Sequence, residues 1–483
     1  MSSKAEDPAK SLYGPCLPQW GENSYFLEVK PRTDFATLFI DCPEGEELLQ
    51  EQQDPETSSN LSAVVRVGEH GICVQYSDRE RPLFVHLERV TIKPESLSTP
   101  AWADHSRLFM CKAKADIEGR QLVAKSYSRL AKEMCSLGDL QNFAESATGS
   151  SVKLQCSCGN VFAQGDKGSL EIGHMPSDDW LNTSPGIDFF CRDTCGAACH
   201  PTSHSCNKDL SLASPHDEWL PKTNKMVISF AYTHVSNDTI IENRIGIDGR
   251  KLTCKACRQE IGITNRTRPH IFQLHHAVTK LSIAARSYLD TNFSTVPSFF
   301  ASCILSKCEA EGSQKIMIRS LDRTPYVLLW LLDTFVVFAG GHLSTETAIT
   351  AKENAKLQRT PSNTSTNSSG SKNSQKKGRK GKRRTSSTSS VSSQASDDGA
   401  IGQIVDNPFP ALKMLYKVFD QNSASSDPRA TGEDSSVSVV DLPAPFAIRI
   451  LEAILRSTCC LPPACRSVGQ FYVGFLPLEE RIM

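Results

Sequence analysis

LQCSCGN at residues 154–160 and LTCKACRQEIG at residues 252–262 are the two stretches that decide the fold of this chain. The second holds Cys254 and Cys257 in C-x2-C spacing, and the first holds Cys156 and Cys158 in the tighter C-x-C spacing. A tetrahedral metal ion binds four soft ligands, which two such thiolate pairs supply when they meet in space. The pattern predicts one structural Zn²⁺ joining two distant parts of a domain. The alternative is that all of them are reduced, buried cysteines without a metal.

The length and composition place bounds on the class of protein. A chain of 483 residues exceeds one typical hydrophobic core and predicts two domains. The formal net charge of -1 gives no overall reason to expect a nucleic acid or an anionic membrane as partner. The first residues, MSSKAEDPAKSLYG, lack the basic and apolar regions of a signal peptide, so the 18 cysteines are expected to be thiols or metal ligands. We therefore expect a cytoplasmic protein with no membrane partner.

Changes in composition along the chain predict its domain organisation. Short alternating apolar runs follow a polar start, and a Ser-, Lys- and Gly-rich stretch later interrupts the apolar pattern. We predict a flexible N-terminus at 1–21, a β-rich domain at 22–150, a zinc-knuckle region at 151–351, a disordered linker at 352–402, and a C-terminal part at 403–483 with a disordered polar insert at 421–438.

Several elements are expected from local pattern. Helices are predicted around Leu122 to Phe143, at Val296 to Cys308 and at Pro445 to Ser457. The apolar run YVLLWLLDTFVVFA, from Tyr326 to Ala339, is too short for a membrane span and predicts buried core strands or a strand–turn–strand. GQFYVGFLPL predicts a terminal strand.

The cysteine- and histidine-rich segment DFFCRDTCGAACHPTSHSC, residues 188–206, is open to three interpretations. It could bind a second zinc ion through Cys195, Cys199, His200 and His204. It could instead be a flexible loop with incidental cysteines, or it could present one thiol or imidazole to a partner. Composition alone does not decide among them.

A conventional catalytic motif is absent from the sequence. No phosphate-binding glycine loop, serine nucleophile elbow or HExxH helix is found. Cys303 falls on an apolar helix, whereas Cys459 and Cys460 follow a helix C-terminus, where the dipole raises a thiol pKa. None of these is a convincing nucleophile. The basic run KKGRKGKRR, Lys376 to Arg384, is either a solvated tail or a nuclear-import or nucleic-acid-binding patch.

Several segments in order resemble the HECT-like, E2-binding ubiquitin ligase family. The matching segments are YFLEVKPRTDFATLFI, LQCSCGN, MPSDDW, DFFC, LTCKACRQEIG, TPYVLLWLLD, LKMLYKVFD and VDLPAPFAIRILEAILR with GQFYVGFLPL. They cover most of the chain outside the two polar inserts. The resemblance implies an α+β protein with a β-rich N-terminal domain and a zinc-stapled, HECT-like C-terminal region with disordered inserts.

The same resemblance implies a function in ubiquitin conjugation. Such a protein binds an E2 ubiquitin-conjugating enzyme and ubiquitin and promotes ubiquitin transfer to substrate lysines, with cyclin-type substrates proposed. A covalent mechanism would pass through a ligase thioester. However, this chain shows no recognisable HECT catalytic cysteine motif, and a scaffold that only positions its partners needs no nucleophile. The catalytic residue therefore has no assignment.

An alternative implied by the resemblance belongs to a different class. In related proteins, a cysteine that follows the LPS-x-x-W motif is thought to enter the metal site of an RNA 3′-end-processing endonuclease. Here Trp180 ends MPSDDW, Cys191 follows the aromatic pair, and Cys199 precedes His200. The predicted partner-facing thiol is Cys191, with Cys199 second. The expected location is the cytoplasm, with the nucleus as an additional location if the basic run Lys376 to Arg384 directs import.

Overall fold

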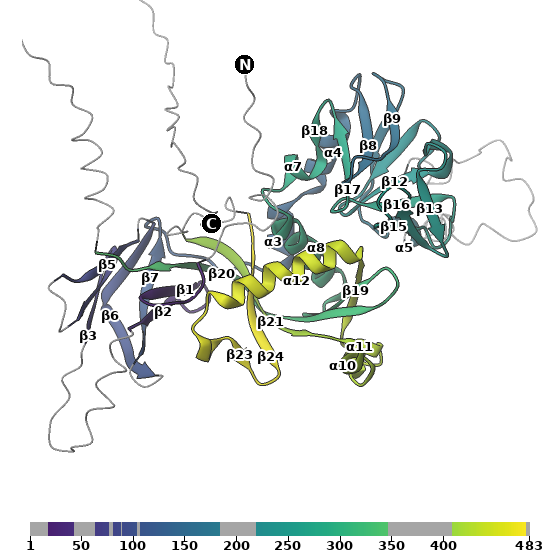
Figure 1. Cartoon of the computed structure of the whole chain (residues 1–483). Coiled ribbons are helices and arrows are strands. Elements are labelled where there is room, and N and C mark those ends of the chain that lie inside the picture. The colour runs from purple at the N-terminus through teal and green to yellow at the C-terminus, as the bar shows by residue number, and fades with distance from the viewer. Residues whose placement is uncertain are drawn as a thin grey trace, which may run out of the picture.

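The computed structural model describes residues 18–42, 63–76, 81–87, 89–103, 107–183, 219–345 and 408–479. Within these ranges the chain folds into four β-sheets with helices packed against them (Figure 1). Sheets and helices alternate irregularly along the chain, so the predicted α+β class is confirmed. No helix in these ranges is long and apolar enough to cross a membrane.

The largest sheet has ten strands and draws on both ends of the sequence. Its main path runs β23-β24-β21-β20-β1-β2-β7-β6, while β19 pairs with both β20 and β22. The strands are β1 (Ser24–Lys30), β2 (Phe35–Asp41), β6 (Val90–Ala103), β7 (Leu108–Ile117), β19 (Lys315–Ser320), β20 (Pro325–His342), β21 (Phe409–Val418), β22 (Ser438–Leu442), β23 (Ser467–Val468) and β24 (Phe471–Pro477).

The apolar run that begins at Tyr326 forms the central strand of this sheet. It is one strand of 18 residues, β20, interrupted only by register shifts opposite β21. The first half of β20 pairs with β19 and its second half with β1. Because β1 lies in the predicted N-terminal domain and β20 does not, one sheet crosses the expected boundary at residue 150. The division into domains stays a prediction.

The two cysteine pairs belong to smaller sheets, which lie together at the upper right of Figure 1. The four-stranded sheet contains β8 (Val152–Cys156), β9 (Val161–Gly165), β17 (Thr279–Ile283) and β18 (Arg286–Ser287). The seven-stranded sheet contains β10 (Glu171–His174), β11 (Lys225–Ile228), β12 (Tyr232–Ser236), β13 (Ile245–Asp248), β14 (Lys251–Cys254), β15 (Glu260–Thr264) and β16 (Ile271–His275). A third small sheet of β3 (Ala63–Gly68), β4 (Gly71–Tyr76) and β5 (Leu83–His86) packs in the same core as β2 and β7.

Eight helices and two short 3₁₀ turns lie among these sheets in the described residues. They are α3 (Tyr127–Met134), α4 (Leu137–Glu145), α5 (Trp180–Thr183), α7 (Tyr288–Asn292), α8 (Val296–Glu311), α10 (Gln421–Ser425), α11 (Pro428–Thr431) and α12 (Ala444–Cys459), with short 3₁₀ turns at Asn237–Thr239 and Pro463–Cys465. The predicted helical stretch before residue 143 is two helices, because Ser136 starts α4 with a capping box. α8 and α12 form as expected, and α12 buries Phe446, Ile450 and Ile454.

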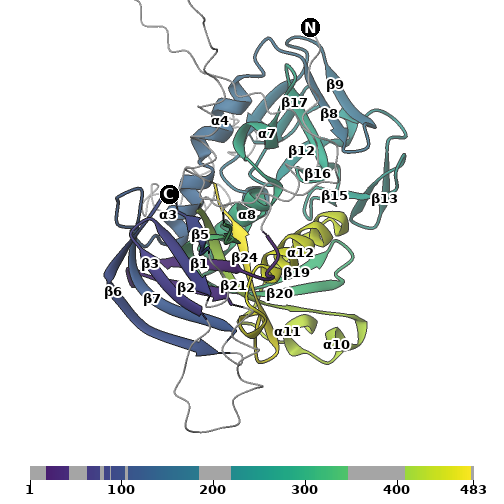
Figure 2. The same cartoon turned by 60° about the vertical axis from the view of Figure 1, so that its left-hand side comes forward.

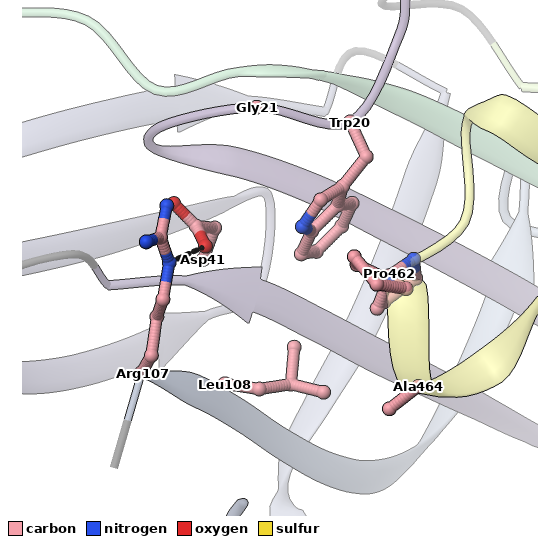
Figure 3. Close-up of a pocket in the computed structure, with 8 residues that line it drawn as sticks. Trp20, Gly21, Asp41, Arg107, Leu108, Pro462 and Ala464 are labelled. Carbon is pink, nitrogen blue, oxygen red and sulfur yellow. Dashed lines mark hydrogen bonds and ion pairs between the residues drawn. The ribbon is translucent and has the colours of Figure 1, made fainter. Parts of the chain in front are cut away.

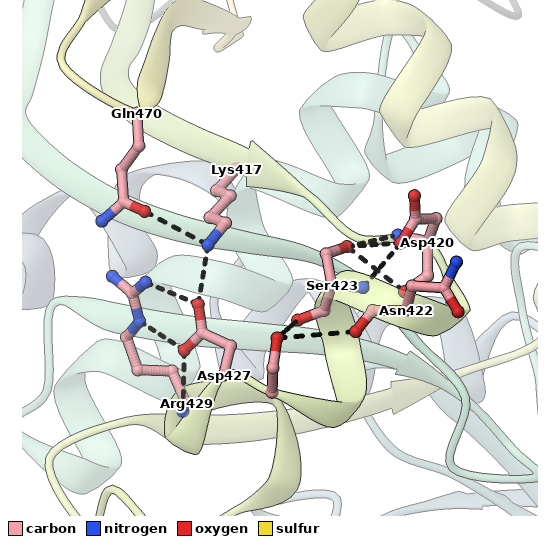
Figure 4. A network of polar contacts seen from close by, with 8 residues as sticks. Lys417, Asp420, Asn422, Ser423, Asp427, Arg429 and Gln470 are labelled. Carbon is pink, nitrogen blue, oxygen red and sulfur yellow. Dashed lines mark hydrogen bonds and ion pairs between the residues drawn. The ribbon is translucent and has the colours of Figure 1, made fainter.

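The polar segment 421–438 differs from the prediction of a disordered insert. It contains α10 and α11, which begin at the N-caps Asp420 and Asp427. The Asp427 carboxylate forms ion pairs with Lys417 at 2.8 Å and with Arg429 at 2.6 Å (Figure 4). Small apolar side chains of the segment also pack against the sheet, namely Ala424, Ala430 and Val437. Caps and buried charge pairs therefore order a segment whose composition is mostly polar.

Candidate metal centre and its surroundings

The four predicted ligands meet at one point between the four- and seven-stranded sheets. The sulfur atoms of Cys156, Cys158, Cys254 and Cys257 all lie within 4.8 Å of one another. Cys156 Sγ is 3.7 Å from Cys257 Sγ, and Cys158 Sγ is 3.8 Å from Cys254 Sγ. Residues about a hundred positions apart in the sequence are thus brought together, as the spacing predicted.

These separations fit a tetrahedral metal ion. Zinc–sulfur bonds of about 2.3 Å in a regular tetrahedron place neighbouring sulfurs about 3.8 Å apart. The observed separations of 3.7 and 3.8 Å match that edge length, whereas a disulfide would require about 2 Å. The group could therefore hold one metal ion through four thiolates.

Tight turns after each strand aim the sulfurs inward. β8 ends at Cys156, and the chain turns back so that the Gly159 N–H donates to the Cys156 carbonyl at 2.8 Å. Gly159 has φ +90°, a backbone conformation in the region that favours glycine. β14 ends at Cys254, whose carbonyl accepts from the Arg258 N–H at 2.7 Å. Each turn thus presents two thiols on one side.

Asn160 adds an interaction outside the ligand set that sequence reasoning missed. Its amide Nδ2 donates to Cys254 Sγ at 3.3 Å, and its Oδ1 accepts from Arg244 Nη1 at 3.0 Å. Such contacts orient a ligand and stabilise its negative charge. In the sequence, the signal that could have pointed to this role of Asn160 is that it directly follows Gly159, the glycine of the first turn.

The thiols differ in their ionisation. Burial raises the pKa of Cys254, but N–H groups of Cys257 and Ala256 and the Asn160 amide outweigh it and lower that pKa to about 7. Burial raises the pKa of Cys156 far above its ordinary value. The Cys254 thiol therefore ionises readily near neutral pH. The buried Cys156 thiol ionises only when a cation lies beside it.

Of the predicted partner-facing residues, Trp180 alone lies in the described part of the chain. It begins α5 and packs edge-on against Trp219, with ring centroids 5.3 Å apart. Both rings cover a small apolar cluster that includes Met175 and Leu181. Cys191, Cys199 and His200 lie outside the described residues. Trp180 therefore has a packing role, and its partner-binding role stays a prediction.

The seven-stranded sheet carries buried polar side chains that were not predicted. His234, His275 and His276 are at most 1% exposed. Ser229 Oγ lies 2.9 Å from His234 Nε2, and the Asp178 carboxylate accepts from a backbone N–H at 2.8 Å. Burial lowers the pKa of each histidine to about 3 and raises the pKa of Asp178 to about 6. The histidines are therefore held neutral inside the protein.

Cys156, Cys158, Cys254 and Cys257 are called the metal group below. Among the other described cysteines, none is both exposed to solvent and lowered in its pKa. Within the described ranges Cys158 alone is exposed, and it belongs to the metal group. Burial raises the pKa of Cys73, Cys111, Cys303, Cys308 and Cys465. The described core therefore offers no activated thiol for acyl transfer.

Fold and site together define a mixed α+β protein in which two of the smaller sheets meet at a group of four cysteines that could hold a metal ion. Comparison of sequences gives the family. Residues 28–473 match the family described as HECT-like ubiquitin-conjugating enzyme (E2)-binding, and this chain belongs to that family.

Individual relatives are distant. The chain is 20% identical over 338 residues to a protein from Bos taurus that is named as an E3 ubiquitin-protein ligase, covering 67% of this chain and 71% of the relative. It is 24% identical over 178 residues to the protein of the same name from Rattus norvegicus, covering 37% of this chain and 42% of the relative. No solved structure matches the chain.

Proposed function

We propose that this protein binds an E2 ubiquitin-conjugating enzyme and promotes transfer of ubiquitin to substrate lysines. The observation that carries the proposal is the match to an E2-binding family over residues 28–473. The two relatives named as E3 ubiquitin-protein ligases support it.

The described cysteines favour a scaffold mechanism. In E2-dependent transfer, the amine of a substrate lysine attacks the thioester carbonyl of the charged E2, and the E2 thiolate leaves. A protein that holds both partners close raises the rate of this step by proximity and orientation alone. It needs no cysteine of its own, in agreement with the raised pKa values of Cys73, Cys303 and Cys465.

We propose that the ion in the four-cysteine centre is a structural Zn²⁺. A set of four thiolates is the donor set that zinc takes at structural sites, and it leaves no open position for a substrate. Its role is to hold β8 of one sheet against β14 of another. The chain would then keep its E2-binding surface in a fixed shape.

An E2-dependent ubiquitination assay tests the proposal. The full chain is incubated with E1, ATP, ubiquitin and a panel of E2 enzymes, and products are resolved on reducing and non-reducing gels. We expect ubiquitin conjugates that depend on both the chain and one E2, with no thiol-sensitive ubiquitin adduct on the chain itself. A thiol-sensitive adduct would contradict the scaffold mechanism. Failure of every E2 to give chain-dependent conjugates would contradict the ligase function.

The second prediction, a chaperone-like role toward an RNA 3′-end-processing metallo-endonuclease, stays a prediction. Its proposed contact residues Cys191 and Cys199 lie outside the described residues. Comparing nuclease binding by wild type, Cys191→Ser and Cys199→Ser tests it, and unchanged binding in both variants would contradict it. The cyclin-type substrate and the cytoplasmic and nuclear localisation are likewise predictions.

A further inference from the structure

The four sulfurs of the metal group differ in their access to solvent. Cys156 and Cys254 are buried and Cys257 is half-buried, whereas Cys158 is exposed. The two sheets that carry the group lie side by side at the top of both views of the molecule (Figures 1 and 2). Cys158 lies in the exposed turn 157–159 that follows β8. A small reagent in solution therefore reaches this sulfur more readily than the other three.

Hydrogen bonds hold the backbone of this turn on both sides of Cys158. The N–H and Oγ of Ser157 donate to the Val278 carbonyl, at 3.1 and 2.9 Å. The Gly159 N–H donates to the Cys156 carbonyl at 2.8 Å. The exposure of the Cys158 side chain is therefore built into the shape of the turn.

Cys158 is in contact with a sulfur of the second turn. Its Sγ lies 3.8 Å from the Sγ of Cys254. A disulfide bond joins two sulfurs at about 2 Å, so these two would have to approach by roughly 1.8 Å. Rotation of the Cys158 side chain about its Cα–Cβ bond moves this sulfur without moving the backbone. The pair is thus close enough to become a disulfide.

Hydrogen bonds distinguish the two members of this pair. The Asn160 amide donates to the Cys254 sulfur at 3.3 Å, and the N–H groups of Ala256 and Cys257 donate to it as well. Among the described residues, no N–H group donates to the Cys158 sulfur. N–H donors stabilise the negative charge of a thiolate and reduce its nucleophilicity. When both cysteines are thiolates, Cys158 is therefore the better nucleophile.

A cavity beside the loop that precedes Cys465 offers no comparable target. Its volume is about 310 Å³, and in it the Trp20 indole faces Pro462 beside the Asp41–Arg107 ion pair (Figure 3). None of the residues that line this cavity is a cysteine. Burial raises the pKa of Cys465, so its thiol stays protonated at neutral pH and reacts slowly with oxidants.

We propose that the metal group is a site of oxidation by peroxides, at which Cys158 and Cys254 form a disulfide and the metal ion is released. This inference rests on the proposed Zn²⁺, because a coordinating thiol is held in its deprotonated, reactive form. It does not depend on ubiquitin transfer.

The reaction consumes one molecule of hydrogen peroxide. The Cys158 thiolate attacks one peroxide oxygen, the O–O bond breaks and hydroxide leaves, which converts Cys158 to a sulfenic acid. The Cys254 thiolate then attacks the Cys158 sulfur and displaces a second hydroxide, which forms the S–S bond. The two thiolates have together given two electrons to the peroxide, and protons from solvent convert both hydroxide ions to water.

Oxidation would replace the metal link between the two turns with a covalent link. Cys156 and Cys257 alone would remain as ligands of the metal group, and two thiolates do not hold zinc as four do. The new bond would join Cys158, which follows β8, to Cys254 at the end of β14. The two sheets would therefore stay attached in the oxidised chain.

Peroxide treatment of the full chain tests the proposal. Elemental analysis gives the zinc content at the start, and a chromogenic chelator follows zinc release during treatment with hydrogen peroxide. Differential alkylation and peptide mapping by mass spectrometry then identify the oxidised cysteines. We expect release of about one zinc ion per chain, and a disulfide between the peptides that contain Cys158 and Cys254. Reduction with dithiothreitol should restore zinc binding.

Two histidine variants provide a matched comparison. Cys158→His and Cys257→His each leave three cysteines and one histidine, a donor set that also binds zinc at structural sites. Peroxide should no longer release zinc from Cys158→His, which lacks the exposed sulfur. Cys257→His keeps the reacting pair and should release zinc as wild type does, and so should Cys465→Ser, outside the metal group. If a histidine variant binds no zinc, the peptide map of the wild type decides.

Each outcome of this experiment either supports or overturns the proposal. Zinc release together with the Cys158–Cys254 disulfide supports it, and so does resistance to peroxide in Cys158→His alone. A treated chain that keeps its zinc overturns this inference but leaves the proposed ion intact. A disulfide between other cysteines, such as Cys254 with Cys257, overturns it as well. An untreated chain without zinc overturns both the proposed ion and this inference.

Discussion

Acid should destabilise this protein steeply because of its buried histidines. His234, His275 and His276 have pKa values of about 3 in the folded chain because burial disfavours their charged form. In the unfolded chain they titrate near 6.5. The unfolded state therefore binds protons first as the pH falls. The stability these groups contribute is present above pH 6.5 and is lost below it.

The magnitude follows from the same shifts. At pH 5 each histidine costs about 2 kcal/mol relative to pH 8, because 1.5 pH units at about 1.36 kcal/mol separate pH 5 from the unfolded pKa. The three together cost about 6 kcal/mol. Asp178 opposes them, since its folded pKa of about 6 lies above its unfolded value of 3.8, and it returns about 1.4 kcal/mol at pH 5. The net loss is about 5 kcal/mol, comparable to the whole stability of a small domain.

Urea unfolding at fixed pH values between 8 and 5 measures this loss. Near pH 5 the slope corresponds to a net uptake of about two protons on unfolding. His275→Leu should reduce that uptake to about one. Metal content is followed in parallel, because acid also protonates the cysteines. A free energy of unfolding that stays constant from pH 8 to pH 5 would refute the account of the buried core.

Three single contacts also carry testable consequences. Cys254→Ser should abolish stoichiometric metal binding, measured by elemental analysis, and melt the small sheets, because binding to four thiolates is worth about 10 kcal/mol or more; retained metal would contradict it. Gly262→Ala places a Cβ 2.0 Å from the Gln273 carbonyl oxygen and should cost about 3 kcal/mol; an unchanged melting temperature would show that the strands are not so close. Glu28→Gln should lower the free energy of unfolding by about 3 kcal/mol, because it leaves the Lys413 ammonium without its buried partner. Adding Lys413→Met should recover most of that stability. No recovery would mean that the loss does not come from the charge pair.

Local signals in the sequence predicted local features well. The cysteine spacings identified all members of the metal group, because the chelating geometry of each pair depends on a few neighbouring residues. The helix at Val296 formed where expected, since Thr295 and Ser298 make a capping box and Gly312 ends it. Apolar patterning likewise located the central strand Pro325–His342 and the terminal strand Phe471–Pro477 of the large sheet.

Features that depend on distant residues could not be predicted. Nothing local to Phe26 indicates that its strand pairs with residues 337–342, more than 300 positions later. The order in segment 421–438 is a different case, because its ion pairs from Asp427 to Lys417 and Arg429 and its capping pair Asp420 and Ser423 are local in the sequence; the overall polar composition of the segment outweighed these signals in the prediction. The buried histidines have no sequence signature, because their neutrality comes from the packing around them.

The measurement that tests the central claim most directly is binding of purified E2 enzymes to the full chain by biolayer interferometry. At least one E2 of a broad panel should bind saturably and reversibly, and binding should be lost in Cys254→Ser, whose small sheets no longer hold together, but kept in the conservative surface variant Lys132→Arg. Absence of binding to every E2, with the wild-type chain folded and its metal site filled, would contradict the assignment of an E2-binding function to this protein.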